Sequence, residues 1–139
     1  MLVELLSLGV VAPGLSDWNE TRSILRGEQQ YIEGPVKVTA PAILSPNERR
    51  RATLATRLAL EAACQAWSGK MTHQQEAPLS VFASSDGDMA LIDRMCRDIY
   101  ENHTSLSPTV FQISVHNAVA GFWSIATNCY HPSTSIAAV

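Results

Sequence analysis

The stretch that decides the fold is "LSPTVFQISVHNAVAGFWSIATNCYHPSTSIAAV", residues 106–139. Asn117 is placed to cap a helix whose first turn is Ala118–Val119–Ala120–Gly121, because asparagine is a favoured N-cap residue. Small residues in that turn let a second backbone pack almost in contact, within one fold or across a dimer. A crowded core helix is an equally good interpretation. The segment 133–139 is short and apolar, which predicts a buried strand directly after the helix.

The N-terminal part of the chain predicts a strand, a turn and a short helix. "VELLSLGVVA" (3–12) is an apolar, β-branched run that ends at Pro13-Gly14, so we expect a buried strand followed by a turn. Ser16 or Asp17 is expected to cap a helix that Gly27 closes. Residues 28–43 are expected to form a surface loop with one short strand in "VKVTA".

The clearest helix signal is "LSPNERRRATLATRLALEAACQAWSG", residues 44–69. Ser45 is the expected N-cap, Pro46 occupies the first helical position, and Glu48 completes a capping box. The many alanines let a neighbouring backbone approach closely, as in a helix between two layers. Gly69 is expected to end this single helix. The charged and polar residues 70–77 that follow are expected to form an exposed loop.

The remaining segments complete an alternating order of strands and helices. "PLSVFASS" (78–85) predicts a second buried strand and a turn, and residues 89–102 predict an amphipathic helix with Leu91, Met95 and Ile99 inward. Residues 105–111 are expected to form a loop. The order β–α–α–β–α–α–β indicates an α/β domain with a mostly parallel sheet.

Composition excludes several classes of protein. A chain of 139 residues with 46% hydrophobic residues is long enough for one globular core. The low charged fraction, 17%, suggests an apolar face that a partner covers. A net charge of -3 argues against a nucleic-acid partner, which requires a basic face. The apolar N-terminus lacks a basic region and contains Glu4, so we expect neither a signal peptide nor a membrane span.

Familiar chemical motifs do not account for the chain. The histidines, at positions 73, 103, 116 and 131, show no metal-ligand spacing, and "SSDGDM" is too short a donor set for calcium. No phosphate-binding loop or GxSxG elbow occurs. We therefore expect no metal and no cofactor. Cys64, Cys96 and Cys129 form no CxxC pattern and are expected to be reduced, mostly buried thiols of a cytoplasmic protein.

Several stretches, in order, resemble the N-terminal half of a β-ketoacyl synthase, a condensing enzyme with the thiolase fold. "LGVVAPGLSDWNETRSILRGE" is similar to the opening strand, turn and helix, and "RRRATLATRLALEAACQAW" is similar to the long helix that follows. "SVFASSDGDM" matches a strand and its turn. The final stretch is similar to the S-P…N-x-x-A-G-x-x-S-I…G-P-x-x-x-I-x-x-A-C block. The matching positions are Ser107-Pro108, Asn117, Ala120-Gly121, Ser124-Ile125, Pro132 and Ile136.

The departures from the family pattern concern its catalytic groups. His131 stands where the family usually has glycine, and the nucleophilic cysteine would follow Val139. The two catalytic histidines belong to the family's C-terminal half, and none of the four histidines here corresponds to them. Cys129 lies too early to be the nucleophile. The resemblance therefore implies a half-domain over residues 1–139, incomplete at its C-terminus, with no catalytic residue of its own and a sheet flanked by helices on both faces.

Within the family, the wording "SVHNA-x-x-G-x-x-SIA" resembles chain length factor-like proteins of bacterial polyketide and fatty-acid-type synthesis, including aryl polyene synthesis. Chain length factors lack the catalytic cysteine and pair with an active ketosynthase. The resemblance implies a ketosynthase partner in a heterodimer, joined through a strand region near "FQISVHN", and contact with acyl carrier protein through the complex. The candidates for the partner surface or acyl pocket are Phe111, Ser114, Val115, His116, Asn117, Gly121, Phe122 and Trp123.

Two alternatives stay open from the sequence. The second hypothesis, an alternative to the chain length factor, is the N-terminal fragment of an active β-ketoacyl-[acyl-carrier-protein] synthase, in which case a cysteine follows Val139. The chain is also compatible with an unrelated α/β interaction domain, which would show a different sheet order.

Overall fold

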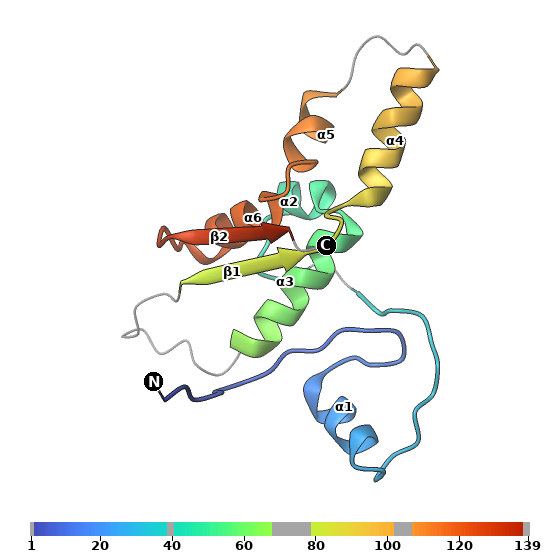
Figure 1. Cartoon of the computed structure of the whole chain (residues 1–139), viewed down its shortest axis with the longest axis vertical. Coiled ribbons are helices and arrows are strands. Elements are labelled where there is room, and N and C mark those ends of the chain that lie inside the picture. Colours follow the sequence, from blue (N-terminus) through green and yellow to red (C-terminus); the bar gives the residue numbers. More distant parts are fainter. Residues whose placement is uncertain (1, 39–40, 68–78, 102–106, 138–139) are drawn as a thin grey trace. The chain divides into compact units, whose positions relative to one another are not determined.

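The computed structural model describes residues 2–38, 41–67, 79–101 and 107–137 (Figure 1). The described chain forms two compact units, one of residues 1–41 and 57–75 and the other of residues 42–56 and 76–139. The elements are α1 (Trp18–Leu25), α2 (Pro46–Arg51), α3 (Leu54–Trp67), β1 (Ser80–Ser84), α4 (Met89–Tyr100), α5 (Pro108–Ile113), α6 (Ala118–Thr127) and β2 (Ser133–Ala137).

The two strands pair in parallel and form a sheet in the second unit (Figure 1). Ser80 is opposite Ser133 and Ser84 is opposite Ala137, so the strands are in register over their whole length. Parallel strands require a long crossover, and here the crossover holds α4, α5 and α6. The predicted α/β class with a parallel sheet is confirmed.

Helix α6 packs on one face of this sheet. Trp123 of α6 is 5% exposed and meets the ring of Phe82 of β1 edge-on, with ring centroids 6.5 Å apart. Because side chains alternate along a strand, Val81 and Ile136 lie on the opposite face. They are 63% and 44% exposed, so the prediction of fully buried strands is wrong for this sheet. The buried residues of the second unit include Leu44, Ala52, Leu91, Ala120, Trp123 and Cys129.

The predicted strand at residues 3–12 is wrong for the part described. Residues 2–11 have no regular secondary structure, and a single bridge joins Ala12 to Leu15 around the turn. A strand requires a hydrogen-bonded neighbour, and no described strand runs beside this segment. Leu5 and Leu6 are 74% and 62% exposed, so the apolar pattern that suggested a buried strand faces solvent.

Side chains instead attach this segment to α3 within the first unit. Gln65 accepts a hydrogen bond from the Val10 N–H at 3.0 Å and donates one to the Ser16 carbonyl at 2.8 Å. The Ser7 hydroxyl donates to the Ala66 carbonyl. A Cβ at Gly9 would overlap the backbone carbonyl of Ala62, so only glycine fits this crossing. The segment is therefore held in place without a strand partner.

Helix α1 forms as its capping residues predict. Asp17 is the N-cap and accepts from the Glu20 N–H at 2.9 Å. Glu20 in turn accepts from the N–H and hydroxyl of Ser16, at 3.0 and 2.5 Å. Gly27 has a φ of +73° just beyond the helix, the left-handed conformation that glycine adopts most readily.

The single helix predicted over residues 45–69 is wrong, because two helices occupy its described part. Ser45 and Glu48 form the expected capping box at the start of α2, with Pro46 in the first turn. The chain then leaves the helical conformation at Ala52, whose ψ is 121°. The Thr53 hydroxyl accepts from the Thr56 N–H at 3.3 Å, an N-cap geometry that starts α3. The competing cap explains the break. Gly69 and the predicted loop 70–77 lie outside the described residues.

The loop predicted at residues 105–111 is wrong where the structure describes it. Pro108 begins α5, with Ser107 as its N-cap. This is the Ser-Pro signal that also opens α2, since proline at the first helical position loses no hydrogen bond. The strand expected near "FQISVHN" is wrong for the same reason: Phe111–Ile113 end α5, and residues 114–117 form a turn.

Three smaller expectations also fail. Residues 36–38 are not a strand, and residues 39–40 lie outside the description. Ile99 of α4 is 59% exposed, whereas Leu91 is buried and Met95 half-buried. Cys96 is exposed and Cys64 half-buried; only Cys129 is buried as expected.

Candidate partner-binding surface

The first candidate residues lie where α5 gives way to α6. Phe111 is in the last turn of α5, and the Ser114 hydroxyl and N–H both donate to its carbonyl, at 2.8 and 3.2 Å. The Ala118 N–H then donates to the Val115 carbonyl at 3.0 Å, so a tight turn joins the two helices. This turn brings Phe111, Val115 and His116 to the surface, all of them exposed.

Helix α6 supplies the other candidates, and they differ in burial. Asn117 is its N-cap as predicted, although its side chain makes no capping hydrogen bond. Gly121 is exposed, and nothing lies within 4 Å of a Cβ built there. Phe122 is half-buried and Trp123 is buried against the sheet. Asn128 closes the helix in the left-handed conformation, with a φ of 52°.

The turn after β1 lies beside one of these candidates. Gly87 has a φ of +63°, and the His116 Nδ1 atom is 3.7 Å from the position of a Cβ on it. The Ser84 hydroxyl accepts from the Gly87 N–H at 2.9 Å. Asp88 caps α4 through one oxygen, at 3.1 Å from the Leu91 nitrogen, while its Oδ2 is buried and accepts no hydrogen bond within the described chain. The "SSDGD" turn and His116 are thus neighbours at the carboxyl end of β1.

The candidate residues therefore fall into three groups according to their burial: core, exposed and half-buried. Trp123 is a core residue, and its ring supports the sheet rather than a surface or a tunnel. The members with exposed side chains or backbone lie along the α5–α6 junction and the first turn of α6: Phe111, Val115, His116, Asn117 and Gly121. Ser114 and Phe122 are half-buried, so their exposure is intermediate between that of Trp123 and that of the exposed candidates.

The resolved pKa shifts among the described residues do not produce a nucleophile. Hydrogen bonds from the side chain and then the backbone of Ser45 hold the pKa of Glu48 below its usual range, and Ser16 does the same for Glu20. Burial, and then the charge of Glu61, raises the pKa of the Cys64 thiol, which disfavours the nucleophilic thiolate. Among the residues that the structure describes, no three His, Cys, Asp or Glu side chains are grouped to hold a metal.

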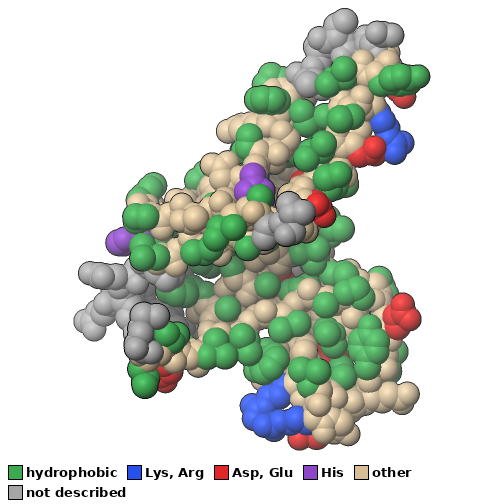
Figure 2. Space-filling model, in the orientation of Figure 1, with side chains coloured by type: hydrophobic (Ala, Val, Ile, Leu, Met, Phe, Trp, Pro, Cys, Tyr) green, Lys and Arg blue, Asp and Glu red, His purple; other side chains and the backbone are tan. Residues whose placement is uncertain are grey.

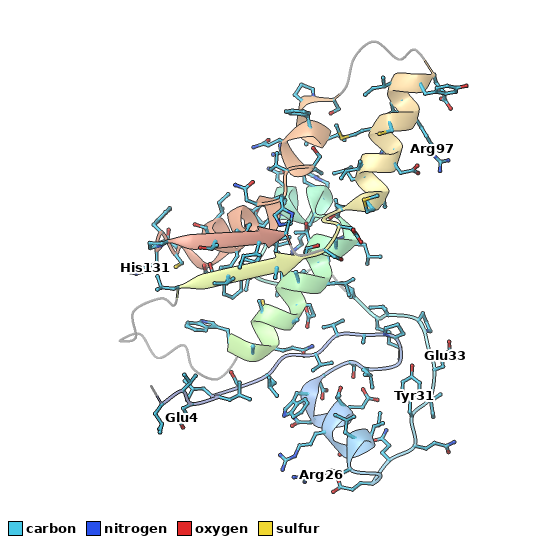
Figure 3. All side chains as sticks on the ribbon, viewed as in Figure 1. Glu4, Arg26, Tyr31, Glu33, Arg97 and His131 are labelled. Atoms are coloured by element: carbon cyan, nitrogen blue, oxygen red, sulfur yellow. The ribbon has the colours of Figure 1, made fainter. Side chains whose placement is uncertain are left out.

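His131 and the other histidines are dispersed. His131 lies immediately before β2 (Figure 3), and His116 lies beside the turn after β1. His73 and His103 lie outside the described residues. Within the described ranges, no helix is both long enough and apolar enough to cross a membrane.

A hollow of about 290 Å³ occurs elsewhere, within the first unit. Its walls come from residues 12–37 and include Glu20, Glu33 and Lys37. Glu20 already accepts two hydrogen bonds from Ser16, so it belongs to the capping of α1. None of the candidate residues lines this hollow.

Comparison with known proteins identifies the class. Residues 18–139 match the family model for the N-terminal domain of β-ketoacyl synthases, and the chain belongs to that family. A comparison with curated proteins finds no match.

A solved structure shows the same fold. It is the ketosynthase ApeO in complex with its chain length factor ApeC, from Xenorhabdus doucetiae. One chain of that complex superposes with a TM-score of 0.69 at 22% sequence identity, over 96% of the present chain and 56% of the solved one. The present chain thus spans little more than half the length of that relative. The expected thiolase-like half-fold is confirmed.

One apolar surface was missed by the sequence reasoning. Met89, Ile92, Cys96 and Ile99 of α4 are all exposed, at helical spacing i, i+3, i+7 and i+10. The sequence instead predicted an inward row at i, i+4 and i+8, formed by Leu91, Met95 and Ile99. Both rows are apolar, so the apolar side of α4 is wider than a helix needs to pack against one neighbour. This width is the feature of the sequence that could have revealed the exposed row.

Proposed function

We propose that this chain is a non-catalytic, chain length factor-like subunit that pairs with a β-ketoacyl synthase in bacterial polyketide or fatty-acid-type synthesis, including aryl polyene synthesis. The observation that carries the proposal is the shared fold with a chain of a complex between a ketosynthase and its chain length factor. The family match over residues 18–139 supports it independently.

None of the three cysteines in the described residues is placed to act as the thiolate of a condensing enzyme. Decarboxylative condensation needs a thiolate to carry the acyl chain, and donors that stabilise the developing negative charge. Cys129 is buried and precedes β2 in the sequence, whereas the family's nucleophile follows the corresponding strand. Cys64 has a raised pKa, and Cys96 is at the middle of α4 rather than at a helix N-terminus.

In this proposal the exposed candidate residues contribute to function by contacting the partner subunit. Phe111 and Val115 are 60% and 45% exposed, and they offer apolar area to a partner. The open space beside Gly121 allows a partner backbone to approach α6 closely. The net charge of -3 favours a protein partner over a nucleic acid. The acyl carrier protein would be reached through the complex, in the cytoplasm, and no cofactor is required.

An alternative function rests on the same family match. The chain would then be the N-terminal part of an active β-ketoacyl-[acyl-carrier-protein] synthase, in which residues of the second half supply the chemistry.

A single co-expression experiment distinguishes the two. The chain is co-expressed with a ketosynthase that has an intact catalytic cysteine, and each species is then incubated with acyl and malonyl thioesters. We expect a complex in which only the ketosynthase becomes acylated. A cysteine directly after Val139 in the natural reading frame, together with acylation of the protein extended through it, would instead establish the alternative. Failure to form any complex would remove the proposed function.

A further inference from the structure

We draw no further inference here: the strongest candidate, the exposed apolar face of α4 formed by Met89, Ile92, Cys96 and Ile99 in the second unit (Figure 2), carries no proposal because nothing in the described structure shows what covers it.

Discussion

The ring of Phe82 in β1 meets the ring of Trp123 in α6 edge-on, with centroids 6.5 Å apart and an angle of 64° between their planes. This contact fixes the helix to the sheet, because edge-to-face pairs stabilise beyond the area they bury. It also decides the role of Trp123, which the sequence left open between core, acyl tunnel and dimer interface.

The first prediction concerns this contact. Trp123→Ala should lower the free energy of unfolding by about 3–5 kcal/mol, because it removes a large buried side chain. Phe111→Ala is the control: Phe111 is 60% exposed, so its loss should change stability by less than about 0.5 kcal/mol. Urea denaturation of the chain measures both. Equal stability of Trp123→Ala and the unmodified chain would show that Trp123 is not a core residue.

The second prediction compares two glycines. Gly9→Ala should destabilise the chain by about 1–3 kcal/mol, because the added methyl group meets the Ala62 backbone. Gly121→Ala should stabilise the chain alone by about 0.5–1 kcal/mol, because alanine is the better helix former and the space is open. Thermal unfolding separates the two. If Gly121 faces the partner, the same alanine should weaken ketosynthase binding, whereas unchanged binding would exclude Gly121 from the interface.

The third prediction concerns the capping box of α2. Ser45→Ala should cost about 1 kcal/mol at neutral pH, since it removes an N-cap hydroxyl. The pKa of Glu48 is lowered in the folded chain, so its contribution is complete above the ordinary value of 4.5 and is lost as the pH falls through the folded value. Denaturation at several pH values should therefore show that Ser45→Ala costs less in acid. An equal cost at every pH would argue that the carboxylate takes no part.

The fourth prediction concerns Cys64. Burial and the nearby Glu61 raise the pKa of its thiol above the ordinary value of 9.0, so little thiolate is present at neutral pH. We expect alkylation of Cys64 to be slow at neutral pH and to accelerate only as the pH rises above 9.0. The matched variant Glu61→Gln should shift this acceleration to lower pH. Rapid alkylation of Cys64 at neutral pH would contradict the expected pKa.

Local signals predicted helix starts well. Asp17, the Ser45–Glu48 capping box and Asn117 all occupy the cap positions expected from their spacing. The caps at Asp17 and Ser45 are predictable because their hydrogen bonds join residues three positions apart, so the sequence contains both partners. The cap at Thr53 also joins residues three positions apart, but it was not predicted, and Ser107 precedes α5 without a side-chain capping hydrogen bond.

Burial and strand pairing were harder to predict, because both depend on distant residues. Residues 3–12 have a strand-like composition, but no described strand pairs with them, and Gln65 and Gly9 determine their path instead. Ile99 fits two helical rows equally well, one with Leu91 and Met95 and one with Met89 and Ile92. Only the structure shows that Ile99 is exposed, as Met89 and Ile92 are. The candidate residues between 111 and 123 were chosen by resemblance, and their different burial could not be read from spacing alone.

The most direct test of the central claim is the composition and labelling of a co-expressed complex. The chain and a ketosynthase are purified together, their stoichiometry is measured by light scattering, and the complex is incubated with an acyl thioester before mass spectrometry. We expect one copy of each subunit, with the acyl group on the ketosynthase alone. An acyl group on the present chain, or two proteins that elute apart, would contradict the account.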